Sequence, residues 1–166
     1  MGTIRLEGIV DESFTDGTGI RYTIFTQGCN HACYNCQNPE TWNFNKGELY
    51  DINDIIADIK SNPMLDGVTL SGGDPMYRTV EVLDLVKRIK EETKLNIWLY
   101  TGFTYEECLE DPDKLEILKH IDVLVDGMYD EHMRSLYLRF RGSSNQRIID
   151  VQESLKKHKI KILIDD

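Results

Sequence analysis

The sequence predicts an α/β fold with a mostly parallel sheet and flanking helices. Three observations lead to this expectation. Short runs of β-branched and aromatic residues alternate with segments of helical periodicity along the chain. The chain contains no repeat, linker or low-complexity segment, and its 166 residues suit one hydrophobic core. We therefore expect a single domain over residues 1–166, in which successive βαβ units place their strands in parallel.

Each element is expected from its local pattern. Strands are predicted where β-branched, aromatic and other apolar residues cluster: 4–10, 22–27, 68–71, 96–100, 123–126, 147–150 and 160–164. Helices are predicted at 52–61, 79–93, 105–109, 114–119 and 152–158. In the helix over 79–93, the expected apolar stripe is Val82, Leu83, Val86 and Ile89. Because these units are fewer than the eight that close a TIM barrel, an open sheet or a partial barrel is expected.

Composition excludes some classes of partner. The formal net charge of −10 disfavours binding to nucleic acid or to an anionic membrane surface, since both need a basic protein face. No stretch approaches the roughly 18 apolar residues that span a bilayer, and the first residues lack the apolar run of a signal peptide. We expect a cytoplasmic protein that binds neither nucleic acid nor membrane.

Four loops follow predicted strands and carry chemically useful residues. They are the cysteine-rich loop after residue 27 and the turns at 72–74, 101–102 and 126–127. The carboxyl ends of parallel strands meet at one edge of a sheet, where α/β proteins bind their ligands. We expect these loops to form one site.

The cysteines have an unusual distribution. Three of the four fall within eight residues, at Cys29, Cys33 and Cys36, and Cys108 stands alone in a predicted helix as a packing residue. A structural zinc site usually has four ligands in two pairs, and a [4Fe–4S] cluster usually takes four cysteines. Three cysteines in one loop leave one iron of such a cluster open. On the residues alone, zinc with His31 as fourth ligand, a disulfide or a redox role stays possible; His31 is otherwise expected to pack against the loop.

A glycine pair marks a second possible contact. Gly72 and Gly73 directly follow a predicted strand and precede Asp74 and Pro75. Two glycines allow the main chain to approach a ligand and to adopt positive φ, although this sequence is also a common turn. A carboxylate beside such a turn is a favourable partner for an ammonium group.

The cysteine spacing, together with this glycine turn, resembles the motifs of the radical S-adenosylmethionine (SAM) superfamily. The resemblance implies an incomplete TIM-like barrel and a [4Fe–4S] cluster, on Cys29, Cys33 and Cys36, whose open iron binds SAM. It further implies contacts to SAM from Asn35, Cys36, Gln37, Gly72, Gly73 and Asp74. The chain departs from the common pattern at two positions, since Asn35 stands where an aromatic residue is frequent and Asp74 where glutamate is frequent.

Within this superfamily, the chain most resembles the anaerobic ribonucleoside-triphosphate reductase activating proteins. The matching segments are 28–42, 69–76, 98–107, 123–127 and 139–150. The polar run 141–147 is the most discriminating, because we find no requirement of the fold that explains it. The resemblance implies an oxidoreductase that cleaves SAM and generates a glycyl radical on the large subunit of the reductase, with flavodoxin or ferredoxin as electron donor. The alternatives are an activase of the pyruvate formate-lyase type and a non-catalytic zinc-binding protein.

Overall fold

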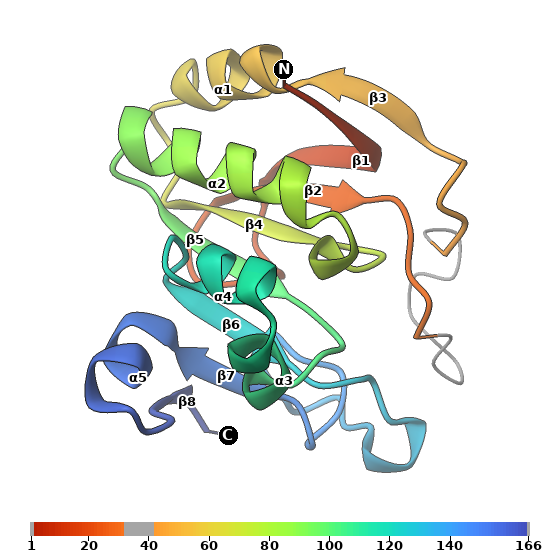
Figure 1. Cartoon of the computed structure of the whole chain (residues 1–166), viewed down its shortest axis with the longest axis vertical. Coiled ribbons are helices and arrows are strands. Elements are labelled where there is room, and N and C mark those ends of the chain that lie inside the picture. Colours follow the sequence, from red (N-terminus) through yellow and green to blue (C-terminus); the bar gives the residue numbers. More distant parts are fainter. Residues whose placement is uncertain (1, 32–41, 166) are drawn as a thin grey trace.

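A computed structural model describes residues 2–31 and 42–165, which form one sheet with helices packed on it (Figure 1). The strand order is β3-β1-β2-β4-β5-β6-β7-β8. The four central strands pair in parallel; they are β2 (Arg21–Thr26), β4 (Gly67–Gly72), β5 (Asn96–Tyr100) and β6 (Val123–Asp126). The expected α/β fold with a parallel sheet centre is confirmed.

The flanks of the sheet are antiparallel, which the sequence analysis did not predict. The flanking strands are β1 (Thr3–Ser13), β3 (Glu48–Asp51), β7 (Arg147–Asp150) and β8 (Ile162–Ile164). A parallel pair needs a crossover connection, usually a helix, whereas a loop can only bring the next strand back antiparallel beside the last. The connections β1–β2 and β6–β7 contain no α-helix, and this explains two of the four antiparallel pairs.

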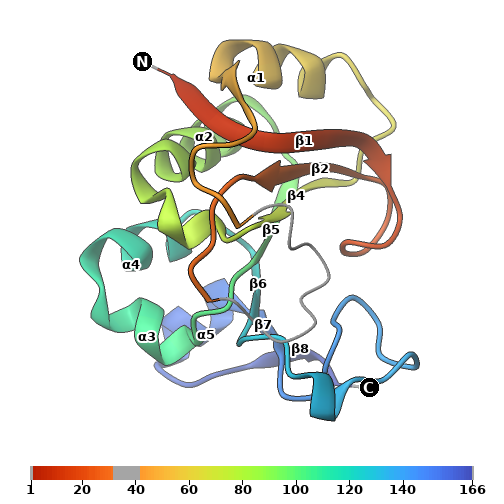
Figure 2. The same ribbon diagram turned by 90° about the vertical axis from the view of Figure 1, so that its right-hand side faces the viewer.

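The helices largely cover one face of the sheet. They are α1 (Ile52–Lys60), α2 (Thr79–Glu92), α3 (Tyr105–Glu110), α4 (Pro112–Leu118) and α5 (Val151–Lys157), with short 3₁₀ turns η2 (Pro75–Tyr77) and η3 (Glu131–Met133). Figure 2 shows α2, α3 and α4 on one side of the sheet and the chain between β6 and β7 on the other. In α2, Leu85 is buried while Leu83 is only partly buried, a correction to the expected stripe. No helix within the described residues is long and apolar enough to cross a membrane.

The two faces of the sheet have separate cores. On β5, Ile97 and Leu99 join the large cluster that includes the helices, whereas Trp98 packs with Val125 and Ile148 in a smaller one. This division follows from the two-residue period of a strand. The smaller core leaves space on its face of the sheet.

Arg21 fills the amino end of that second face. Its fully buried guanidinium donates to Thr69 Oγ1 at 2.7 Å and to Asn96 Oδ1 at 2.7 Å, and it lies 5.4 Å from the centre of the Trp98 ring. Burial lowers the pKa of Arg21 to about 10, so the group stays charged at neutral pH. The free space is therefore displaced toward the carboxyl ends of the parallel strands.

Candidate functional site

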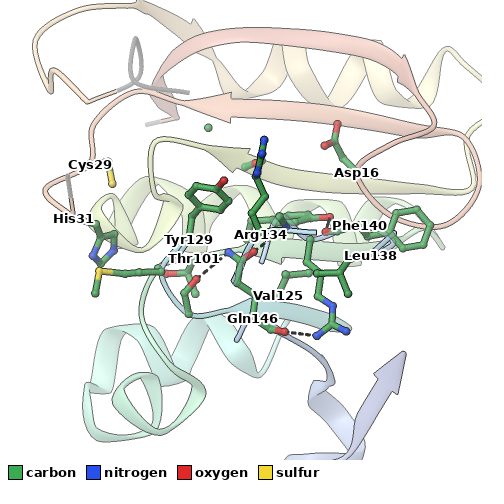
Figure 3. A pocket seen from close by; sticks show the side chains of 18 of the residues that line it. Asp16, Cys29, His31, Thr101, Val125, Tyr129, Arg134, Leu138, Phe140 and Gln146 are labelled. Atoms are coloured by element: carbon green, nitrogen blue, oxygen red, sulfur yellow. Dashed lines mark hydrogen bonds between the residues drawn. The ribbon is translucent and has the colours of Figure 1, made fainter. Parts of the chain in front are cut away.

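A cavity of about 780 Å³ opens at the carboxyl ends of the parallel strands (Figure 3). This volume lies in the range typical of sites for small molecules. The turns after β2, β4, β5 and β6 all contribute to the wall, with Cys29, His31, Gly72, Gly73, Thr101, Gly102 and Gly127. The expectation that these four loops meet at one sheet edge is confirmed for the described residues.

Cys29 is the one predicted cluster ligand within the described residues. Its side chain is half-buried at the cavity wall, and its N–H donates to the carbonyl of Trp42 at 3.1 Å. The preceding Gly28 has a φ of +118°, and a Cβ there would lie 2.3 Å from the Phe44 ring, so only glycine fits. The other residues predicted in this loop lie outside the described residues: Cys33, Asn35, Cys36 and Gln37.

Cys108 lies apart from this site. It is fully buried on α3 within the large core. Burial raises the pKa of the Cys108 thiol to about 12, which keeps the thiol protonated at neutral pH. A cysteine must be a thiolate to bind a metal, so the environment of Cys108 agrees with the packing role expected from the sequence.

Asp74 joins three of the loops around the cavity. Its carboxylate is 1% exposed. One oxygen accepts a hydrogen bond from Met76 N at 2.9 Å; the other accepts from Thr101 Oγ1 at 2.9 Å, Gly102 N at 2.9 Å and His31 Nε2 at 2.6 Å. These donors come from the loops after β2, β4 and β5. Asp74 therefore fixes the relative positions of the loops, a role that the sequence did not indicate.

The glycine pair is held against the loop that carries Cys29. Gly73 N donates to Thr26 O at 2.9 Å, and Asp74 N donates to Gly28 O at 2.9 Å. Gly72 has a φ of +106°, and a Cβ at this position would lie 2.4 Å from Thr26 N. The glycines thus permit a close approach of two main chains and leave main-chain atoms at the cavity wall.

His31 contributes both packing and polarity. Its ring makes an edge contact with Phe103 at a centroid distance of 4.7 Å and a tilted contact with Tyr77 at 5.2 Å. Its side chain is 10% exposed, and Nε2 donates to Asp74. The ring thus packs against residues that follow β4 and β5, and the bond to Asp74 links the cysteine-rich loop to the glycine turn. That His31 packs around the cysteine-rich loop stays a prediction.

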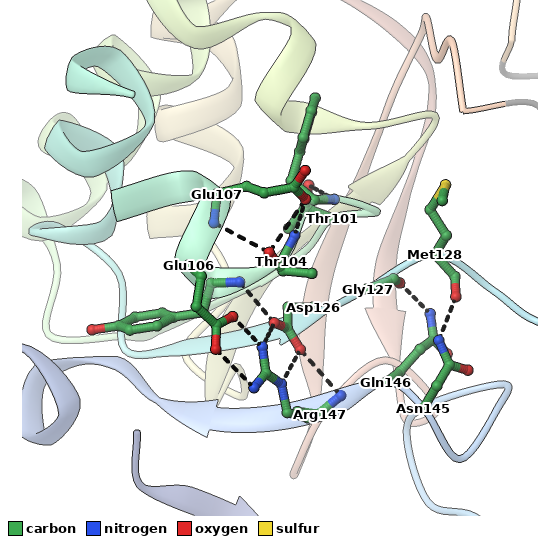
Figure 4. Close-up of polar contacts among 12 residues, drawn as sticks. Thr101, Thr104, Glu106, Glu107, Asp126, Gly127, Met128, Asn145, Gln146 and Arg147 are labelled. Carbon is green, nitrogen blue, oxygen red and sulfur yellow. Dashed lines mark hydrogen bonds and ion pairs between the residues drawn. The ribbon is translucent and has the colours of Figure 1, made fainter. Parts of the chain in front are cut away.

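A second polar network lies at the end of β6 and the start of β7 (Figure 4). The buried carboxylate of Asp126 accepts from Arg147 Nε at 3.1 Å and from Tyr105 N at 2.7 Å. Arg147 Nη2 also donates to Glu106 Oε1 at 2.7 Å. The bond to Arg147 lowers the pKa of Glu106, and the bond to Asp126 raises the pKa of Arg147. Strands β6 and β7 and helix α3 are tied together by this network.

The polar run 141–147, which had no structural explanation in the sequence, has one in the structure. The Gln146 side chain accepts from Gly142 N at 2.9 Å and donates to Gly127 O at 3.0 Å, while Asn145 Nδ2 donates to Met128 O at 2.8 Å. These bonds fold the run back onto the end of β6. They hold the last residues of the β6–β7 connection beside its first residues, at the end of β6.

Replacing Arg147 by methionine is expected to lower the free energy of unfolding by about 3 kcal/mol, because the buried Asp126 charge loses its counterion. Glu106→Gln is the matched control, because it removes the other carboxylate partner of Arg147. The Glu106 side chain is 58% exposed, so this change should lower the free energy of unfolding by less than about 1 kcal/mol. Urea unfolding followed by circular dichroism measures both. Equal losses for the two variants would contradict a dominant Asp126–Arg147 pair.

Several known proteins are similar to this chain in sequence, and one solved structure was compared with its fold. A family model described as "4Fe-4S single cluster domain" matches residues 15–149. Relatives named "Anaerobic ribonucleoside-triphosphate reductase-activating protein" include those of Enterobacteria phage T4, 37% identical over 87% of this chain and 93% of that protein, and of Vibrio cholerae, 42% identical over 80% and 89%. The protein of Escherichia coli K12 is 36% identical over 79% and 88%. The crystal structure of QueE from Escherichia coli covers 61% of this chain and 54% of its own, with 17% identity and a TM-score of 0.47. By its sequence similarity to these relatives, the chain belongs to the family of anaerobic ribonucleoside-triphosphate reductase-activating proteins.

Proposed function

We propose that this chain is an oxidoreductase that cleaves SAM reductively at a [4Fe–4S] cluster and generates a glycyl radical on the large subunit of anaerobic ribonucleoside-triphosphate reductase. One observation carries the proposal: Cys29, the glycine pair and the Thr101–Gly102 turn line the same cavity. The relatives of this chain are named as activating proteins of that reductase, which supports the choice of partner.

The residues present fit an iron–sulfur cluster. A half-buried thiol at the cavity wall is accessible to a ligand, unlike the buried Cys108. We assign the cluster to Cys29, Cys33 and Cys36, and contacts with the adenosyl group of SAM to Asn35, Cys36 and Gln37. When bound, the cluster supplies the single electron that splits SAM into methionine and a 5′-deoxyadenosyl radical, which takes a hydrogen atom from the target glycine.

The methionine end of SAM is assigned to the glycine turn. Gly72 and Gly73 present main-chain atoms to the cavity, because neither residue carries a side chain of its own. Asp74 belongs to this site as the residue that holds the turn against Thr101 and Gly102. We therefore assign Asp74 a positioning role: its carboxylate is 1% exposed and accepts four hydrogen bonds within the protein.

The fold supplies orientation and exclusion of water. We interpret the sheet as an incomplete radical SAM barrel whose open side admits a loop of another protein. The chain between β6 and β7 covers part of that side, and the bonds of Gln146 and Asn145 to the main chain of Gly127 and Met128 hold its far end at the end of β6. The proposal includes flavodoxin or ferredoxin as electron donor and a cytoplasmic location.

Electron paramagnetic resonance tests the proposal directly. The anaerobically reconstituted protein is incubated with SAM, a reductant and the reductase, and a glycyl doublet on the reductase is expected together with 5′-deoxyadenosine. A reductase whose radical glycine is replaced by alanine is the control and should give no doublet. No doublet on the native reductase, with one on a pyruvate formate-lyase, would overturn the choice of partner.

A further inference from the structure

The chain between β6 and β7 forms an ordered rim along the opening of the cavity. We call residues 128–146 the β6–β7 rim. Tyr100 Oη donates to Phe140 O at 2.5 Å, Ser144 N donates to Met133 O at 2.9 Å, and Asp130 N donates to Ser143 Oγ at 3.1 Å. In Figure 3, Tyr129, Arg134, Leu138 and Phe140 of this rim lie along one side of the cavity and Asp16 along the other.

Two large apolar side chains of the β6–β7 rim are exposed, at residues 136–137, which we call the tip of the rim. Leu136 is 89% exposed and Tyr137 is 93% exposed, the highest values for large hydrophobic residues in the part of the chain that the structure describes. Leu136 itself lines the cavity, so the tip stands at the opening. Such exposure contributes nothing to the core, and an apolar group beside a functional cavity is typical of a protein-binding surface.

The opposite side of the opening carries a matching feature. Phe14, in the connection between β1 and β2, is 68% exposed, and its neighbours Thr15 and Asp16 line the cavity. Each of the two segments that line the cavity, at 14–16 and 136–138, therefore contains an exposed aromatic residue. Aromatic residues at such positions supply the buried anchors of protein interfaces.

The β6–β7 rim is more basic than the rest of the molecule. The rim, residues 128–146, has three arginines against two acidic residues, Asp130 and Glu131, whereas the whole chain has 19 basic and 29 acidic residues. Arg134 and Arg139 are exposed on this stretch. Arg134 lies 3.7 Å from Glu131 of the same rim, so the rim carries a small excess of basic charge on an acidic protein, which favours an acidic partner surface.

We propose that Phe14 and the tip of the β6–β7 rim form the docking surface for the reductase, and that the reductase loop bearing the target glycine enters the cavity between them. The complementary surface on the reductase is apolar where it meets Tyr137 and acidic where it faces the arginines. This inference rests on the proposed function, since it assigns the partner of the same cavity.

The test uses the double variant Phe14→Ser/Tyr137→Ser in the reconstituted holoenzyme. The control, Leu49→Ser/Val80→Ser, removes two apolar side chains that are 61% and 77% exposed on β3 and α2. The Kd for the native reductase should rise about tenfold or more in the rim variant and stay unchanged in the control. Glycyl radical formation should slow at low reductase concentration and recover at saturation, while SAM cleavage without reductase keeps the wild-type rate.

The outcomes separate the two proposals. If the wild-type protein generates the glycyl radical and the rim variant binds the reductase equally well, the docking surface is wrong and the proposed function stands. If the wild-type protein generates no radical on the reductase, both proposals fall. Affinity of the wild-type protein that does not decrease with rising salt would contradict the acidic complement on the reductase.

Discussion

Replacing Cys29 by alanine is expected to leave the protein with no stable [4Fe–4S] cluster and no SAM cleavage. The proposed cluster has three cysteine ligands and would retain two in this variant, too few to hold it against loss of iron. After anaerobic reconstitution, the wild-type protein should contain about four irons per chain, and Cys29→Ala should contain nearly none. Iron and acid-labile sulfide analysis measures this difference directly. The same loss is expected for Cys33→Ala and Cys36→Ala.

Cys108→Ala is the matched control for this experiment. Cys108 is fully buried, and its raised pKa keeps the thiol protonated, so its loss should change only the packing of α3. The variant should keep its irons and its SAM cleavage. If Cys108→Ala lost the cluster while Cys29→Ala kept it, the ligand assignment would be wrong. A wild-type protein that contained one zinc and no iron would support the non-catalytic zinc-binding alternative instead.

The central elements of the fold could be predicted because their information is local. The expected bounds of β5, β6 and β7 match the structure, since each is a short buried apolar run that ends at polar or glycine residues. Strand β3 was not predicted: its residues Glu48–Asp51 are mostly exposed and become a strand only by pairing with β1, more than forty positions earlier in the chain. Strand direction at the flanks likewise depends on what connects the strands rather than on their composition.

The residues of the candidate site likewise divide into those with a local signal in the sequence and those without one. Spacing and glycine content indicated Cys29, Gly72 and Gly73, because a loop that wraps a metal or approaches a ligand has a local signature. The partners of Asp74 have none, since His31 lies 43 positions before it and Thr101 lies 27 after it. The carboxylate was therefore predicted as a ligand contact from the family resemblance and from its chemistry. Only the assembled loops show that it accepts four hydrogen bonds within the protein.

The link between His31 and Asp74 leads to the second large expected effect. We expect His31→Phe to bind SAM about tenfold more weakly than the wild-type protein, because a hydrogen bond to a charged group contributes roughly 1.5–3 kcal/mol. Phenylalanine keeps the aromatic contacts with Tyr77 and Phe103 but cannot donate to Asp74. The cysteine-rich loop and the glycine turn would then lose one of their direct connections. Titration of SAM against the reduced cluster, read by the change in its electron paramagnetic resonance spectrum, measures the affinity.

A conservative variant separates positioning from stability. His31→Gln loses the ring contacts but retains a side-chain N–H that can donate to Asp74, so it should bind SAM more tightly than His31→Phe. A purely structural role predicts the reverse, because the ring contacts with Phe103 and Tyr77 would matter more than the bond. The iron content of both variants should equal that of the wild-type protein. A His31→Phe variant with wild-type SAM affinity would show that the three remaining donors to Asp74, from Met76, Thr101 and Gly102, suffice to hold the glycine turn in place.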